Sequence, residues 1–222
     1  MKTALVVGAT GATGSALVNA LLTSDQYRAI HLVSRRTTHW RHREVIREHI
    51  LPLSRIGDLT TPYAIDEVYC CLGTTMKTAG SKAAFRAVDY GAVVALGQWA
   101  KENGVGQLHV ISSKGANAGS RNFYLRTKGE MEQALSALDL PTLYLYRPSL
   151  LSGERIDDRR GERFGEFILN RLTWLPGSAK WRPVPIDTLA QAMIERAHRH
   201  EGKGRFRIES EQILQLDPIA SE

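Results

Sequence analysis

The chain has 222 residues, of which 43% are hydrophobic and 23% are charged, a composition that excludes disordered, collagen-like and disulfide-stapled proteins. Its 29 Lys and Arg residues against 23 Asp and Glu residues give a net charge of +6, which favours acidic partners such as phosphates or nucleic acid. The two cysteines, Cys70 and Cys71, are sequence neighbours that cannot easily bridge each other, so we expect a reducing, intracellular compartment. No apolar run approaches the roughly 18 residues of a membrane span, and a buried-strand pattern follows Lys2 directly, which predicts a cytoplasmic protein with no membrane partner.

Short apolar runs alternate with amphipathic segments along the first two thirds of the chain. Residues 3–7 (TALVV) form a run too short for a helix, so they predict a fully buried strand. Further strands are expected at 29–33, 68–72, 108–112 and 142–146, and helices at 11–22, 82–103 and 123–138. This alternation predicts parallel β-α-β units. We therefore expect an α/β protein with a doubly wound, mostly parallel, Rossmann-like sheet, and a single NAD(P)-binding domain over residues 1–222.

The stretch from residue 37 to residue 55 is rich in arginine and histidine. Its histidines, His39, His42 and His49, could be imagined as a metal site. Metal-binding histidines usually come with a carboxylate or thiolate at a fixed spacing, whereas the glutamates here are more simply ion-pair partners. We interpret the stretch as a solvated basic loop that leads into a strand near 49–53, and we expect no metal.

After residue 147 the strict alternation ends. Residues 154–165 are expected to form a charge-dense loop, 167–175 a short amphipathic helix, and 205–208 a last strand. Asp187 is expected to cap a helix over 188–198. No linker separates this part from the rest, so residues 150–222 are predicted to contribute the substrate-side wall of the same domain.

A glycine-rich turn lies between the first strand and the first helix, where a pyrophosphate-binding turn belongs. It reads GATGATG over residues 8–14. Its glycines allow a tight turn, a close approach of the backbone to phosphate and close packing of helix on strand, and the helix N-terminus adds unpaired N–H groups. The cofactor-binding residues expected here are Gly8, Thr10, Gly11, Ala12, Thr13 and Gly14.

Two arginines follow the second predicted strand. Arg35 and Arg36 stand about 20 residues beyond the third glycine, where an NAD-selective protein usually carries a carboxylate. Arginine suits the 2′-phosphate of NADP. The pair therefore predicts NADP as the cofactor, the alternative being an ordinary surface pair on a basic protein.

A further glycine follows the strand at 68–72. Parallel sheets bind ligands at the carboxyl ends of their strands, so four residues are expected to line the cofactor crevice: Cys71, Leu72, Gly73 and Thr74. A nucleophilic role for Cys71 is the alternative. It is disfavoured because no histidine is placed beside it by the sequence and buried cysteines are mostly inert.

Tyr124 and Lys128 stand four residues apart at the start of a predicted helix, so both project from one face. An ammonium beside a phenol lowers the pKa of the phenol from about 10 towards neutrality, which lets it exchange a proton with a substrate oxygen. Ser113, eleven residues upstream of Tyr124 at the end of another strand, could hold that oxygen in place.

These motifs resemble the atypical branch of the short-chain dehydrogenase/reductase superfamily. More closely, the CCLGTT block at 70–75, the SSKGA block at 112–116, Lys128 with its neighbours and the Arg147-Pro148 pair resemble the family of the mammalian Tat-interacting oxidoreductase and its small bacterial relatives. The resemblance implies a Rossmann-like fold that binds NADP, with Ser113, Tyr124 and Lys128 as the catalytic set. Ser112 remains open as the acting serine.

The same resemblance implies further cofactor contacts. Ser112, Tyr124, Lys128 and Pro148 are expected to contact the dinucleotide. Relatives often carry an aspartate near the adenine after the third strand, where this chain has Leu53. Asp58 imitates that motif but leaves too few residues before the next strand for the helix that should intervene, so Leu53 is the expected adenine contact.

The resulting functional prediction is an NADP-dependent oxidoreductase that transfers hydride between the nicotinamide and a small carbonyl or alcohol substrate. The cofactor carries that chemistry, while the protein supplies orientation and a proton. A non-catalytic regulatory or redox-sensing module that binds NADP is the alternative. A nucleic-acid partner is disfavoured because aromatic residues for base stacking make up only 7% of the chain and are not interleaved with the arginines.

Overall fold

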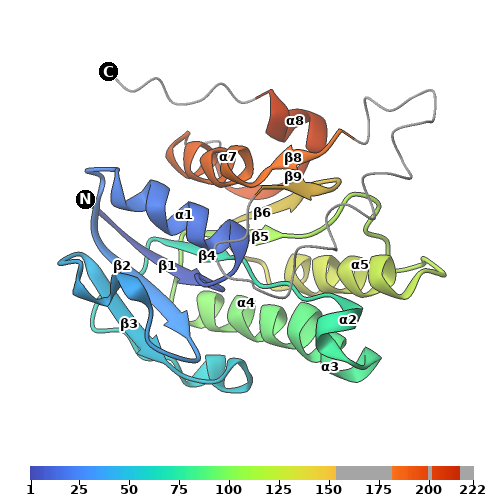
Figure 1. Ribbon diagram of the computed structural model, residues 1–222, viewed down its shortest axis with the longest axis horizontal. Helices are drawn as coiled ribbons and strands as arrows, with labels where there is room; N and C mark the ends of the chain where they lie inside the picture. The colour runs from blue at the N-terminus through green and yellow to red at the C-terminus, as the bar shows by residue number, and fades with distance from the viewer. Residues whose placement is uncertain (154–181, 200–201, 216–222) are drawn as a thin grey trace.

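A parallel sheet of seven strands organises the computed structural model, which describes residues 1–153, 182–199 and 202–215. The strand order in this part of the chain is β3-β2-β1-β4-β5-β6-β9 (Figure 1). The strands are β1 Lys2–Val7, β2 Tyr27–Ser34, β3 Ile46–Ile50, β4 Glu67–Cys70, β5 Gln107–Ile111, β6 Thr142–Arg147 and β9 Gly204–Glu209. All six neighbouring pairs are parallel. The predicted α/β, Rossmann-like sheet is confirmed.

Helices connect the strands and cover both faces of the sheet. They are α1 Ala12–Leu22, α2 Met76–Ala79, α3 Lys82–Arg86, α4 Val93–Glu102, α5 Phe123–Ser136, α7 Ile186–His198 and α8 Ser210–Leu214. Short 3₁₀ helices span His39–His42 and Leu53–Asp58, and a small two-stranded ladder joins β7 Leu151–Ser152 to β8 Val184–Pro185. Within the described ranges, no helix is long and apolar enough to cross a membrane.

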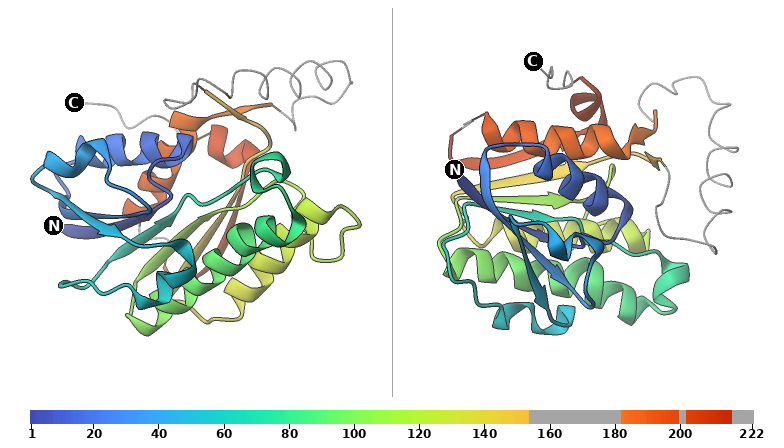
Figure 2. Two further views of the ribbon diagram at one scale, coloured as in Figure 1. Left: turned by 60° about the horizontal axis from the view of Figure 1, so that its bottom comes forward. Right: turned by 60° about the vertical axis from the view of Figure 1, so that its left-hand side comes forward.

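Alternate residues of the strands face opposite helical layers. Ala4, Val6, Ile30 and Leu32 belong to a core cluster shared with α1 and α7. Leu5 and Val7, which point to the opposite face, pack with α4 and α5. Figures 1 and 2 show these helices on the two faces of the sheet. Both faces are therefore buried, which is why the strands appear in the sequence as continuous apolar runs.

The order of the strands reverses at β1, which pairs with β2 on one side and β4 on the other. In a doubly wound sheet, the carboxyl ends of the strands at this switch point form the ligand crevice. Gly8, which follows β1, and Cys71, which follows β4, lie in close contact at this switch point. A Cβ on Gly8 would lie 2.8 Å from the carbonyl group of Cys71, and its φ of +87° also favours glycine.

The helix predicted over 82–103 is one continuous helical run with a wider turn inside it. Residues Ala87–Ala92 form a π-helical turn between α3 and α4. Such turns are rare and occur frequently at functional sites. Here the turn places Asp89, 1% exposed, beneath the loop that follows β4.

The third strand lies earlier than the sequence predicted. We expected it near 49–53, but β3 spans Ile46–Ile50, and Leu53 instead begins a 3₁₀ helix after Pro52. Because β3 is an edge strand, its charged residues, such as Arg47, can face solvent, and the apolar signal that marks a central strand is missing.

Asp187 does not cap the helix as predicted. The N-cap of α7 is Pro185, no side-chain capping bond is present there, and Asp187 is the second residue of the helix. Pro185 belongs to β8 and pairs with Ser152, so the chain turns into the helix immediately after it. Asp187 lies in the first turn, where a carboxylate faces the positive end of the helix dipole.

The elements predicted after residue 147 can be compared with the structure only in part. The strand predicted at 205–208 is confirmed within β9. The predicted loop at 154–165 and helix at 167–175 lie outside the described residues.

Candidate functional site

The glycine turn folds tightly against the first helix. The amide of Gly11 donates to the carbonyl of Gly8 at 3.0 Å, and the hydroxyl of Ser15 donates to the carbonyl of Ala9 at 3.0 Å. A Cβ on Gly14 would lie 2.1 Å from the Gly8 carbonyl oxygen, so that position has no room for a side chain. The sequence therefore folds here into the turn that brings the N-terminus of α1 to the crevice.

The predicted arginines lie next to this turn. A hollow of about 340 Å³ is lined by Thr10, Ser34, Arg35 and Arg36. The Ser34 hydroxyl donates to the carbonyl of Arg36 at 2.6 Å, which fixes the turn at the end of β2. The structure thus brings one residue of the glycine turn and both arginines to a single concave surface whose side chains carry positive charge.

The segment after β4 borders the crevice on the other side. The amide of Cys71 donates to the carbonyl of Val7 at 2.8 Å, and the amide of Thr74 donates to Asp89 Oδ2 at 2.9 Å. A Cβ on Gly73 would meet only Asp89 Oδ1, at 3.9 Å, so the backbone here is open to close approach. Burial raises the pKa of the Cys70 thiol to about 11 and that of Cys71 still further, which makes both poor nucleophiles.

Lys128 is buried, 3% exposed, with its ammonium at the carboxyl end of β5. Its Nζ lies 2.8 Å from Asp89 Oδ1 and donates to the carbonyl of Ile111 at 3.3 Å. Burial alone would lower the pKa of Lys128, but the charge of Asp89 and its bond to the ammonium outweigh burial and raise the pKa above its ordinary value. The ammonium is therefore held charged and in a fixed position.

Tyr124 lies one helical turn before Lys128, at the start of α5. Asn122 caps this helix by accepting the amide of Leu125 at 3.1 Å. The phenol is 36% exposed, and its ring lies 5.7 Å from that of Phe85. Ser113 follows β5 and is 8% exposed. Its hydroxyl makes one long contact, at 3.4 Å, with the carbonyl of Lys114.

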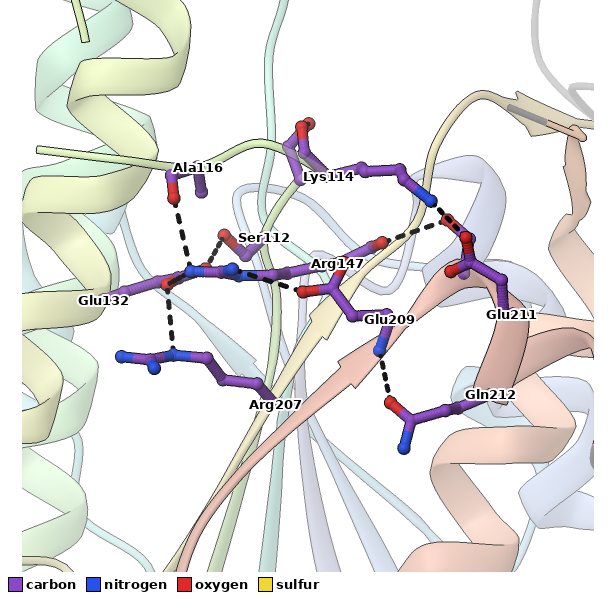
Figure 3. A network of polar contacts seen from close by, with 11 residues as sticks. Ser112, Lys114, Ala116, Glu132, Arg147, Arg207, Glu209, Glu211 and Gln212 are labelled. Carbon is purple, nitrogen blue, oxygen red and sulfur yellow. Dashed lines mark hydrogen bonds and ion pairs between the residues drawn. The ribbon is translucent and has the colours of Figure 1, made fainter. Parts of the chain in front are cut away.

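The neighbouring Ser112 belongs to a buried ionic network (Figure 3). Its hydroxyl donates to Glu132 Oε1 at 2.5 Å. The guanidinium of Arg147 donates to both oxygens of Glu132, at 2.9 Å from Nε and 2.5 Å from Nη2. Arg147 also bonds the carbonyl of Ala116 and pairs with Glu209 at 3.2 Å. The two adjacent serines are therefore in different environments.

Other predicted contacts lie around this centre. The amide of Lys114 donates to the carbonyl of the buried Pro148 at 2.9 Å, which joins the loop after β5 to the end of β6. Leu53 follows β3 and is partly buried against the core cluster that contains Leu5 and residues of α4 and α5. Among the described residues, no three potential metal ligands are grouped, and His49 instead bonds His31 at 2.8 Å.

Two acidic residues of the site were missed by sequence reasoning. Asp89 shares a helical face with Phe85, Val93 and Leu96, all buried. Glu132 similarly shares a face with buried residues of α5. An acidic residue on an apolar helical face is expensive to bury without a partner, and this signal could have identified both.

The sequence also matches a described family. Residues 4–211 match the NAD dependent epimerase/dehydratase family. The chain belongs to that family. The chain is also 28% identical over 221 residues to Protein HTATIP2 of Rattus norvegicus, covering 97% of this chain and 89% of that protein. It is 31% identical over 203 residues to the mitochondrial Protein FMP52 of Candida albicans, covering 87% of each. The expected membership of the atypical short-chain dehydrogenases/reductases is confirmed.

Solved structures of the epimerase/dehydratase fold are similar to this chain. MoeE5 in complex with UDP-glucuronic acid and NAD aligns with a TM-score of 0.70 at 18% identity, covering 93% of this chain and 76% of that one. An oxidoreductase of the short-chain dehydrogenase/reductase family from Burkholderia thailandensis aligns with a TM-score of 0.69 at 15% identity, covering 96% and 93%. These similarities show a nucleotide-binding Rossmann fold.

The predicted cytoplasmic location is corrected by the same comparison. Several curated relatives, including FMP52 proteins of Debaryomyces hansenii, Candida albicans and Coccidioides immitis, are named mitochondrial. The sequence argument considered a membrane span, a cleavable secretory signal and the two unpaired cysteines, and unpaired cysteines do not distinguish one reducing compartment from another.

Proposed function

We propose that this member of the epimerase/dehydratase family is an NADP(H)-dependent oxidoreductase that interconverts a carbonyl and an alcohol. The observation that carries the proposal is the position of Lys128: its Nζ bonds the carbonyl of Ile111 at the end of β5, just before Ser113, and Tyr124 lies one turn earlier on the same helix. One side chain there can exchange a proton, a second can hold a substrate oxygen, and a third supplies a fixed positive charge.

The residues at the crevice fit a dinucleotide. Gly8, Gly11 and Gly14 bring backbone to the end of α1 without side chains, which suits a pyrophosphate at a helix N-terminus. The hollow beside Thr10 carries Arg35 and Arg36, whose guanidinium groups suit the 2′-phosphate that distinguishes NADP from NAD. When bound, the cofactor would supply or accept the hydride.

The side chains of the protein would transfer the proton and orient the substrate. In the reducing direction, the phenol of Tyr124 would donate its proton to the carbonyl oxygen of the substrate, and the cofactor, when bound, would supply the hydride for the carbonyl carbon. The Ser113 hydroxyl donates a hydrogen bond to the same oxygen. Lys128 stays charged throughout because Asp89 compensates its burial, and it can offer a donor to the ribose of the cofactor.

Cofactor selectivity tests the first half of the proposal. Replacing Arg35 and Arg36 together with Ala should weaken NADPH binding by a few kcal/mol, since each charge-assisted bond is worth about 1.5 to 3 kcal/mol, and should barely change NADH binding. The matched control is Arg41→Ala, an exposed arginine of the same basic stretch that lies outside the hollow. Equal affinity of the unmodified protein for the two cofactors, measured by titration, would refute NADP selectivity.

Removing the hydroxyl of Tyr124 tests the proposed role of this residue as the proton donor. Turnover is measured as NADPH consumption with a panel of small aldehydes, ketones and quinones. Tyr124→Phe should keep the fold and most NADPH affinity but reduce turnover by about 10² to 10⁴, the usual worth of a positioned acid or base. Tyr63→Phe, which removes the hydroxyl of an exposed tyrosine far along the chain from the site, is the control and should retain full turnover.

The outcomes also separate an enzyme from a regulatory module. If the unmodified protein binds NADPH and consumes none with any substrate of the panel, a non-catalytic NADP-binding module replaces the reductase. If turnover is found and Tyr124→Phe retains it, the proton-donor role is wrong even though the oxidoreductase stands.

A further inference from the structure

We propose that Glu132 is a positioning residue for the active-site loop. Its carboxylate engages the Ser112 hydroxyl and the Arg147 guanidinium together, which leaves Ser113 as the serine presented to substrate. The inference deepens the proposed function and rests on it for the catalytic role of Ser113, whereas the positioning of the loop rests on the contacts themselves.

The position of Glu132 in the fold is the first argument. Its side chain is 3% exposed, yet it accepts hydrogen bonds from Ser112 and twice from Arg147, with distances of 2.5 to 2.9 Å. Bidentate pairs of this kind fix geometry as well as charge. A buried ion pair is weak evidence for stability, because apolar residues of similar volume often serve equally well. The best-supported role of a buried ion pair is to specify a single arrangement of the segments that it joins.

The segments that the pair joins are the second argument. Glu132 lies on α5, two turns beyond Tyr124 and one beyond Lys128. Through Arg147 it reaches the end of β6 and, by the 3.2 Å bond to the Ala116 carbonyl, the loop after β5. Figure 3 shows this guanidinium between Glu132, Ala116 and Glu209. This pair of side chains therefore joins the helix that carries the proposed acid to the loop that carries the serine, in addition to the bond from the Asn117 amide to the Leu125 carbonyl at 3.0 Å.

The two serines then have distinct roles. The Ser112 hydroxyl donates to Glu132 at 2.5 Å and is 4% exposed, so its proton is already committed to the carboxylate. Among the described residues, the Ser113 hydroxyl makes only the long contact with the carbonyl of Lys114. A hydroxyl that must donate to a substrate oxygen needs its proton available, and Ser113 meets that requirement.

The test uses two variants that remove the pair in different ways. Glu132→Gln keeps the shape and the bond from Ser112 but places an NH₂ group against Arg147. The double variant Glu132→Met with Arg147→Met removes both charges and retains volume. Glu130→Gln is the matched control, since Glu130 lies two residues away on the same helix and pairs with Arg86 at the surface.

Three properties of the full-length variants are measured: the thermal midpoint, NADPH affinity, and amide hydrogen exchange in peptides covering residues 112–117. The amides of Lys114 and Ala116, which bond the carbonyls of Pro148 and Ser113, report directly on the loop. Turnover is divided into kcat and KM. Ser113→Ala and Ser112→Ala are compared in the same assay.

The expected result is a loop that is looser while the rest of the protein is unchanged. In the double variant, the thermal midpoint should stay within about 5 °C of the parent, and exchange at 112–117 should quicken by about tenfold with β1 amides unchanged. For both variants, kcat should fall by about 10- to 100-fold with NADPH affinity within about threefold. Ser113→Ala should lose more turnover than Ser112→Ala.

Each contrary outcome has one meaning. Parental exchange at 112–117 in both variants overturns the positioning role, whether or not turnover is found. A greater loss in Ser112→Ala than in Ser113→Ala overturns the assignment of the serine. If the unmodified protein has no turnover but the exchange result is as expected, the oxidoreductase proposal fails while the positioning of the loop stands.

Discussion

Acid should destabilise this protein through His109, a buried histidine on β5. The ring is fully buried between those of Tyr69 and Tyr144, with centroids 4.8 and 4.7 Å away. Its Nε2–H donates to Gln107 Oε1 at 3.1 Å, because that oxygen can only accept, and its Nδ1 therefore accepts the hydroxyl of Tyr146 at 3.0 Å. The bond from Tyr146 requires the neutral imidazole, because a protonated Nδ1 can only donate.

The size of the effect follows from the pKa. Burial, then the charges of Lys2 and His198, lower the pKa of His109 from its ordinary value of 6.5 to about 3. The unfolded chain thus binds a proton that the folded chain refuses, so the contribution to stability is complete above pH 6.5 and is lost as the pH falls towards 3. One pKa unit corresponds to about 1.4 kcal/mol, so the full loss is about 5 kcal/mol.

Urea unfolding at a series of pH values from 7 to 4 provides the measurement. His109→Gln removes the titrating group and should have a flatter dependence of unfolding free energy on pH than the parent, although it is less stable at pH 7. His42→Gln, at an exposed position of the first 3₁₀ helix, should retain the parental dependence. Part of the slope persists in every variant because burial also lowers the pKa of His31, to about 4. Identical slopes for His109→Gln and the parent would refute the reasoning.

Three further predictions concern the crevice. Gly11→Val should fold but fail to bind NADPH in a titration, since its side chain would enter the space beside the phosphate turn, and normal binding by the folded variant would contradict the turn assignment. Gly14→Ala should lower the unfolding free energy by about 2 to 3 kcal/mol, because its Cβ would lie 2.1 Å from the Gly8 carbonyl oxygen. The control, Gly57→Ala, has nothing within 4 Å, and equal urea midpoints for the two would count against this packing argument. Iodoacetamide at pH 7.5 should leave Cys70 and Cys71 of the folded protein unmodified, since burial raises both pKa values, and rapid alkylation detected by mass spectrometry would overturn that view of the thiols.

The central strands and the glycine turn could be predicted from the sequence because their signals are local. A buried parallel strand is apolar throughout, and β1, β5 and β6 appear as such runs. The edge strand β3 could not be placed, since one of its sides is solvated and Arg47 and Glu48 interrupt the pattern. Asp187 was misassigned because a cap depends on where the backbone turns, and Pro185 in the ladder with Ser152 sets that point.

The site residues could likewise be predicted only where the signal in the sequence was local. The predicted arginines and Thr10 do share a hollow, because both follow neighbouring strands and parallel strands end at one edge. Sequence spacing could not identify Asp89 as the ion-pair partner of Lys128. Asp89 lies 39 residues earlier, and the π-helical turn brings its carboxylate to the ammonium. The different surroundings of Ser112 and Ser113 likewise depend on Glu132, which lies on a separate element.

The link from Arg147 to Glu209, together with that from Lys114 to Glu211 at 2.6 Å, has a consequence for biosynthesis. Chains grow from the amino end, and N-terminal parts generally fold first during synthesis. The glycine turn and α5 are made well before β9 and α8, which supply the two carboxylates. A nascent chain can therefore assemble the part of its sheet that carries the glycine turn early, but the loop that carries Ser113 gains these two anchors only after β9 and α8 have left the ribosome.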